Sequence, residues 1–151
     1  MDIDKELSVI FSEVLKEIIA TFSGFSLDIM SNEADNDFDE MTGVMSLNGE
    51  KNGILFLSAK EKDIRSLCSY IIGADNDEIT GEDIEDTLCE LVNMTAGSAK
   101  LRLSGSDYVF NLSAPFILKG QNMRVVGKKK TRVISNTLGN DEITIKVKVV
   151  Y

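Results

Sequence analysis

The sequence predicts an α+β domain in which long amphipathic helices pack on one side of a largely antiparallel β-sheet. Apolar residues recur at helical spacing in three segments, 4–22, 60–72 and 80–103. Strand-like segments separated by turn residues fill most of the chain after residue 108, and a hairpin signal lies between the first two helices. This mixture of separate helical and strand-rich regions is typical of α+β folds.

The length and composition are those of one domain. The chain has 151 residues, of which 43% are hydrophobic, which is enough for one substantial core. No repeat, linker or low-complexity segment divides it. We therefore expect residues 1–151 to form a single domain.

The first helix is expected over residues 4–22 and should end at Gly24. Its apolar positions, which recur with the period of a helix, are Leu7, Ile10, Phe11, Val14, Ile18 and Phe22. Residues 26–31 alternate as a short strand, and the acidic, turn-rich segment 32–40 is expected to be a loop.

A hairpin is expected next, with strands at 44–48 and 54–58 around the turn residues GEKNG. Residues 60–72 should form a second helix, and residues 73–78 lead into the third. Further strands are expected near 108–112, 115–118, 122–126, 131–136 and 142–150. In the last strand apolar and polar residues alternate, so one face should be buried and the other wet: Ile145, Val147 and Val149 against Thr144, Lys146 and Lys148.

The third helix, expected over residues 80–103, has two faces of different character. Thr80 is a natural N-cap, and Asp83 makes an imperfect capping box with it. At about 100° per residue, the positions on the core side are Ile84, Leu88, Leu91, Thr95 and Ala99. A row of four residues lies within about 40° on the opposite side: Asp86, Glu90, Asn93 and Gly97.

The spacing of this row has chemical consequences. Residues three apart on a helix have Cβ atoms about 5–6 Å apart, so Glu90 and Asn93 can touch one partner together. A carboxylate can bind a cation, and an amide can donate to one oxygen while it accepts from a water. Gly97 leaves room for another backbone to approach. A solvated polar face is the alternative interpretation, and for an isolated Glu-x-x-Asn pair it is the commoner one.

Several function classes are excluded by residue content. The chain has no histidine, which removes the usual general base and the triad chemistries. Cys68 and Cys89 are far apart with no C-x-x-C pair, which favours reduced, buried thiols in a cytoplasmic protein and argues against a metal site. The apolar segment 14–22 is broken by Lys16 and Glu17, so we expect neither a signal peptide nor a membrane span.

Charge argues against nucleic-acid binding. The formal net charge is −9, with 22 acidic and 6 basic residues in residues 1–90 and 3 acidic and 10 basic residues in residues 91–151. The lysine run 128–130 has no interleaved aromatic residues, so a solvated loop explains it better than a phosphate-binding patch.

The row on the third helix resembles the signature of the CheC–CheX–FliY family of chemotaxis phosphatases. That signature has Asp or Ser, Glu and Asn at the spacing of Asp86, Glu90 and Asn93, and a downstream proline, here Pro115. The interval from Asn93 to Pro115 is slightly shorter than in the family's pattern. The order of elements is similar over nearly the whole chain. The first helix lacks a second Glu-x-x-Asn, so the resemblance is to the single-site CheX type.

The resemblance implies a phosphatase whose substrate is the aspartyl phosphate of a CheY-type response-regulator receiver domain. It implies that Asn93 positions the attacking water and that Glu90 pairs with the receiver's active-site lysine. Asp86, Gly97 and Pro115 are expected to contact the substrate protein or shape the surface that meets it. No metal or cofactor of the chain's own is implied, because the magnesium belongs to the receiver.

The strand-like residues Val109, Phe110 and Leu112, with the strands that follow, are expected to leave an exposed sheet edge, and the family resemblance implies a homodimer joined through sheet edges. From the charge balance and the broken apolar segment we expect neither nucleic acid nor a membrane as a partner. Two alternatives remain beside the phosphatase. One is a module of the same fold that binds a receiver without turnover. The other is a dimeric regulatory protein in which the polar helix face is incidental.

Overall fold

The computed structural model of the chain describes residues 2–31 and 37–151. Within these residues the helices are α1 (Ile3–Ser23), α2 (Glu61–Ile72) and α3 (Gly81–Arg102), with a 3₁₀ turn, η1 (Asn76–Glu78), before α3. The strands are β1 (Asp28–Ser31), β2 (Met41–Gly49), β3 (Gly53–Ala59), β4 (Phe110–Asn111), β5 (Phe116–Lys119), β6 (Val133–Gly139) and β7 (Thr144–Val150).

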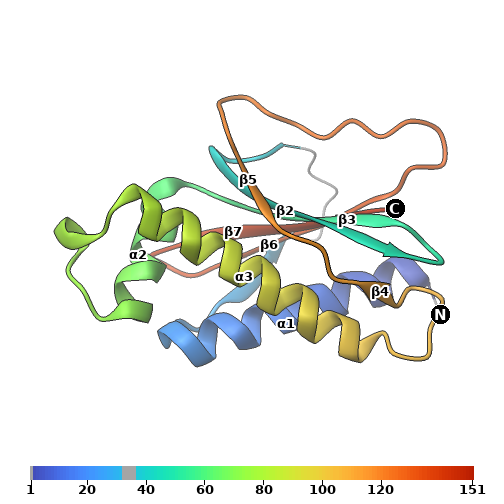
Figure 1. Cartoon of the computed structure of the whole chain (residues 1–151), viewed down its shortest axis with the longest axis horizontal. Helices are drawn as coiled ribbons and strands as arrows, with labels where there is room; N and C mark the ends of the chain where they lie inside the picture. Colours follow the sequence, from blue (N-terminus) through green and yellow to red (C-terminus); the bar gives the residue numbers. More distant parts are fainter. Residues whose placement is uncertain (1, 32–36) are drawn as a thin grey trace.

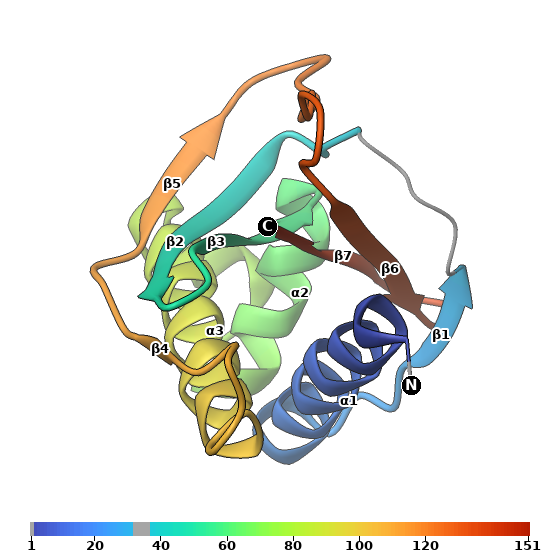
Figure 2. The same cartoon turned by 90° about the vertical axis from the view of Figure 1, so that its right-hand side faces the viewer.

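The strands form one antiparallel sheet whose order is β1-β6-β7-β3-β2-β4, with β5 also paired to β2. All three helices lie on one face of this sheet, and the loop from β5 to β6 passes on the other side (Figures 1 and 2). The predicted α+β class, with helices on one side of a largely antiparallel sheet, is therefore confirmed. Among the described residues, no helix is both long enough and apolar enough to cross a membrane.

Local sequence signals explain where the helices begin and end. α1 begins after Asp2, whose side chain accepts from the Asp4 amide, and ends at Gly24, whose φ of 79° lies in the left-handed region. α2 ends in the same way at Gly73, with φ 70°. Each of these predicted helices ends within about two residues of its expected position.

Segment 122–126 is not a strand, which corrects the expectation from its alternating apolar residues. Asn122 has a φ of 57°, a left-handed conformation that interrupts an extended chain. Only Arg124 forms an isolated bridge, to Asp37. The Met123 carbonyl accepts from the Phe38 amide at 2.9 Å, so this segment bonds to residues before β2 and does not extend the sheet. Of the acidic loop expected over residues 32–40, residues 32–36 lie outside the described residues.

The face of β7 away from the helices is not wet throughout, as the alternation had suggested. Lys148 is fully buried there, and its Nζ donates to Ser135 Oγ at 3.2 Å. The ammonium lies 5.7 Å from the centre of the Phe38 ring, and that ring packs on Phe56 with centroids 5.0 Å apart. The segment before β2 therefore covers part of the sheet that the sequence pattern left exposed.

Two apolar residues also differ from expectation. Phe22, which continues the apolar series of α1, is 50% exposed at the end of that helix. Phe110 is buried, with 2% of its surface exposed, although it was expected at an exposed sheet edge. β4 is only a short strand on β2, and the Phe110 side chain joins the main core.

α3 lies against β2 at a position where β2 has no side chain. A Cβ on Gly43 would come within 2.6 Å of Val92 Cγ2 and 3.2 Å of Leu88 Cγ. Both of these α3 residues are fully buried. Glycine at this position thus allows the helix to pack directly on the strand backbone.

We predict that Gly43→Ala destabilises the fold by about 1–3 kcal/mol, because the added methyl overpacks the contact between α3 and β2. Gly97→Ala is the matched control, since a Cβ at Gly97 meets nothing within 4 Å. That control should be neutral or stabilising, because alanine favours a helix interior. Chemical denaturation of both variants checks this, and equal stability of Gly43→Ala and wild type would contradict the packing account.

Candidate functional site

α3 carries the candidate site because packing fixes which of its faces points outward. Its core side is buried through Ile84, Leu88, Leu91, Val92, Thr95, Ala96 and Ala99. Asp86, Glu90 and Asn93 are exposed, and Gly97 is partly exposed. The structure thus brings four sequence-predicted site residues to one face of one helix.

The start of α3 is anchored by a complete capping box. The Thr80 amide donates to Asp83 Oδ2 at 2.9 Å, and the Asp83 amide donates to Thr80 Oγ1 at 3.1 Å. Aspartate therefore performs the role that glutamate usually has in this motif. The two bonds satisfy backbone donors that the first turn would otherwise leave unpaired.

Gly97 is not required by the packing of the chain itself. It has no positive φ, and a Cβ built on it would meet no atom within 4 Å outside its own helix backbone. This open space lies one turn beyond Asn93 on the same face. The absence of a side chain there keeps the helix backbone accessible to another molecule.

Pro115 immediately precedes β5, the strand that pairs with β2 next to α3. An ion pair between Lys119, at the end of β5, and Glu85 ties this strand to α3. The hydrogen bond that the exposed Lys119 ammonium donates to Glu85 raises the pKa of Lys119 above its ordinary value. Sequence reasoning missed this contact, because no local pattern relates residues so far apart in the chain.

The one thiol beside the row is a poor nucleophile. Cys89 is partly buried and precedes Glu90. Burial raises the pKa of its thiol, and the nearby carboxylates of Asp86 and Glu85 raise it further. A protonated thiol does not attack phosphorus or carbon centres readily, so we assign no covalent chemistry to it.

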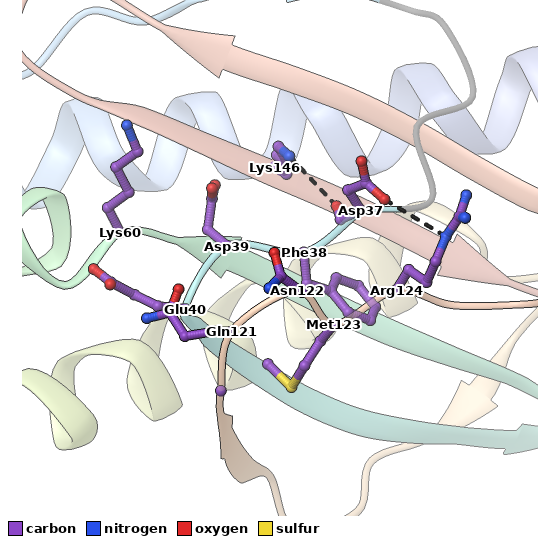
Figure 3. A pocket seen from close by; sticks show the side chains of 11 residues that line it. Asp37, Phe38, Asp39, Glu40, Lys60, Gln121, Asn122, Met123, Arg124 and Lys146 are labelled. Carbon is purple, nitrogen blue, oxygen red and sulfur yellow. Dashed lines mark hydrogen bonds and ion pairs between the residues drawn. The ribbon is translucent and has the colours of Figure 1, made fainter.

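A hollow of about 580 Å³ lies between segments 37–40 and 120–124, away from the row on α3 (Figure 3). Of the charged side chains in its wall, Arg124, Lys146 and Glu40 bond to neighbouring parts of the chain. Arg124 pairs with the Asp37 carboxylate at 3.6 Å, and Lys146 Nζ donates to the Asp37 carbonyl at 3.4 Å. Glu40 accepts from the first amide of α2 at 2.7 Å. These bonds give the residues structural roles, so we place the candidate site on α3.

The row has no metal-ligand geometry. Among residues 2–31 and 37–151, no group of three or more Asp, Glu, Cys or His side chains is arranged to hold a metal ion. What the row offers is one amide and two carboxylates on a rigid helix. Such a set can orient a water and bind a cation that another molecule supplies.

Comparison with solved structures finds the same fold in several chemotaxis proteins. Chemotaxis protein CheX from Vibrio vulnificus is 17% identical, with a TM-score of 0.83 over 95% of this chain and 97% of that chain. A CheC-like superfamily protein from Shewanella sp. PV-4 is 22% identical, with a TM-score of 0.84 over 99% and 98%. The CheX–CheY–BeF3–Mg complex from Borrelia burgdorferi matches at 15% identity, with a TM-score of 0.77 over 93% and 95%.

Comparison with curated proteins found no match. A scan against protein families matches residues 41–138, which is more than half of the chain, to the family described as chemotaxis phosphatase CheX. The matched segment includes the whole of α3, Pro115 and the whole of β5. The chain therefore belongs to the CheX family of chemotaxis phosphatases.

Proposed function

We propose that residues 1–151 form a single phosphatase domain that accelerates loss of the aspartyl phosphate from a CheY-type receiver domain in the cytoplasm. The observation that carries the proposal is the placement of Glu90 and Asn93, three residues apart on the exposed face of α3. Membership in the CheX family supports the reaction class. The Borrelia burgdorferi complex, in which a CheX is bound to CheY with BeF3 and magnesium, supports the class of partner.

The reaction requires few chemical groups from this chain. A water oxygen forms a bond to phosphorus, the bond between phosphorus and the aspartyl oxygen breaks, and the receiver's carboxylate leaves with the electron pair. One proton of the water stays on the oxygen now bound to phosphorus, and the other passes to another oxygen of the released phosphate. An acyl phosphate is already reactive, so a partner that orders the water in line with that bond is sufficient for acceleration.

Asn93 and Glu90 divide this work. The Asn93 amide accepts from the attacking water and holds it in line with the phosphoryl group. Glu90 pairs with the receiver's active-site lysine and so anchors the complex. Gly97 permits close approach of the receiver backbone, Pro115 shapes the start of β5 beside the helix, and Asp86 adds a second carboxylate to the surface. The magnesium belongs to the receiver.

A module of the same fold that binds receivers without turnover is the second candidate. It would use the same exposed face but would not change the lifetime of the aspartyl phosphate. The variants below distinguish it from the phosphatase, because they separate effects on binding from effects on rate.

We predict that Asn93→Ala lowers the maximal rate of receiver dephosphorylation by a factor on the order of 10²–10³, because one preorganised polar group is lost. Binding and fold should remain, since the side chain is exposed. Leu101→Ala, on the same helix and 78% exposed, is the control for a general change of this surface. The measurement is the dephosphorylation rate at saturating protein. If Asn93→Ala kept a maximal rate near that of wild type, Asn93 would have no part in the reaction.

We predict that Glu90→Ala chiefly raises the concentration needed for half-maximal activity. Loss of one partner of an interfacial charge pair commonly costs about 2–5 kcal/mol, since the other charge is left unpaired. Added salt should weaken wild type more than the variant. Glu82→Ala, the same charge change in the first turn of α3, is the matched control. Unchanged affinity of Glu90→Ala for the phosphorylated receiver would contradict the anchoring role.

We predict that Gly97→Ala weakens receiver binding although it does not destabilise the free protein. The added methyl projects into space that is open in the chain alone but lies under an approaching backbone in the complex. Titration with the receiver measures the affinity of the variant, and a denaturation curve measures the stability of the free protein. A variant that is stable and binds as wild type does would show that no backbone approaches here.

We further propose a homodimer joined through a sheet edge, with β5 as the strand that pairs with the second copy. Among the described strands β5 pairs with β2 alone. Phe116 is 50% exposed and Leu118 is 39% exposed on this strand. An apolar edge strand of this kind favours pairing with another chain.

Sedimentation at micromolar protein should therefore give a species of about twice 16.6 kDa. Leu118→Lys should shift it towards monomer, because a charge on an edge strand opposes pairing. Ile29→Lys is the matched control, since Ile29 is 41% exposed on β1 at the other edge of the sheet. A single 16.6 kDa species for wild type would rule the dimer out.

A further inference from the structure

A second hollow lies beside the polar row, where α1, α2 and α3 meet. Its volume is about 370 Å³. Its lining combines four apolar side chains with two carboxylates: Phe22, Ile71, Leu91, Met94, Asp86 and Glu90. Glu90 thus belongs both to the row that contains Asn93 and to the wall of this hollow.

The packing of the chain itself does not explain why this region remains apolar. Of its apolar lining, Phe22 is 50% exposed, and Ile71 and Met94 are only partly buried. Side chains of this size usually bury most of their surface, and an exposed apolar cluster rimmed by charges is typical of an interaction site.

The charges of the hollow restrict what can occupy it. Among the described residues that line it, two are carboxylates and none is a cation, whereas the hollow of Figure 3 has Lys60, Arg124 and Lys146 in its wall. A purely apolar occupant would leave Asp86 and Glu90 desolvated without a partner. An anionic occupant, such as a fatty acid, would be repelled. An occupant with an apolar group next to a cation satisfies both parts of the lining.

We propose that this hollow is the docking pocket for an apolar side chain of the receiver that lies next to a cationic one. The inference rests on the proposed function, because the receiver whose lysine pairs with Glu90 must lie over the adjoining wall. Phe22, Met94 and the carboxylates then select which receivers bind, while Asn93 acts on whichever receiver is bound. Phe22 and Met94 are specificity-determining residues, with no part in the reaction itself.

Two variants test the pocket by different routes. Phe22→Ala removes its most exposed apolar wall, and Thr87→Lys places a cation in the lining between Asp86 and Glu90. Each should raise the receiver concentration for half-maximal dephosphorylation by about tenfold, with the effect on half-saturation rather than on maximal rate. Val9→Ala, 49% exposed on the same helix and remote from the pocket, is the control and should behave as wild type does.

Tryptophan supplies a direct readout of docking. The chain has no tryptophan, so Phe22→Trp introduces a single reporter in the pocket wall. Emission should shift to shorter wavelength when a receiver treated with beryllofluoride and magnesium is added and its own signal is subtracted. Val9→Trp should show no shift.

The failures are distinguishable. If wild type accelerates dephosphorylation but Phe22→Ala and Thr87→Lys keep the wild-type half-saturation and Phe22→Trp shows no shift, the pocket is wrong and the phosphatase remains. If wild type fails to accelerate the loss of phosphate from any phosphorylated receiver, the proposed function fails and the pocket fails with it.

Discussion

The contact between α3 and β2 is the constraint on which the rest of the structure depends. Because Gly43 has no side chain, Leu88 and Val92 lie directly against the strand. This contact sets the rotation of α3 about its own axis, and the rotation decides which residues face outward. A small rotation of the helix would bury Glu90 or expose an apolar residue, and both changes are costly. The capping box at the start of α3 fixes the residue at which the helix begins.

A rigid helix face is well suited to the proposed chemistry, since the chain would contribute position and not reactivity. It has no histidine, and burial together with neighbouring carboxylates keeps Cys89 protonated through a raised pKa. An amide and a carboxylate held on one face can order a water and bind a cation, but they need a partner that brings the reactive phosphate. Specificity would then come from the surfaces beside the row, where apolar side chains and carboxylates share one hollow.

The helices and the polar row could be predicted from the sequence, because both depend on the period of one continuous segment. The capping residue Thr80 and the terminating Gly24 were equally local signals. What could not be predicted depends on contacts between distant segments. Lys148 lies against Phe38 from the segment before β2, and segment 122–126 bonds to that same segment instead of extending the sheet. Phe22 follows the apolar period of its helix but faces a gap between helices, and no local pattern encodes such a gap.

The account is tested most directly by phosphate loss from a CheY-type receiver labelled on its aspartate, followed with this protein at a small fraction of the receiver concentration. We expect the rate to rise in proportion to the added protein, with each molecule releasing phosphate from many receivers in turn. Phosphate loss at the rate of the receiver alone, even when protein is raised until the receiver is fully bound, would contradict the central claim that this face of α3 is catalytic.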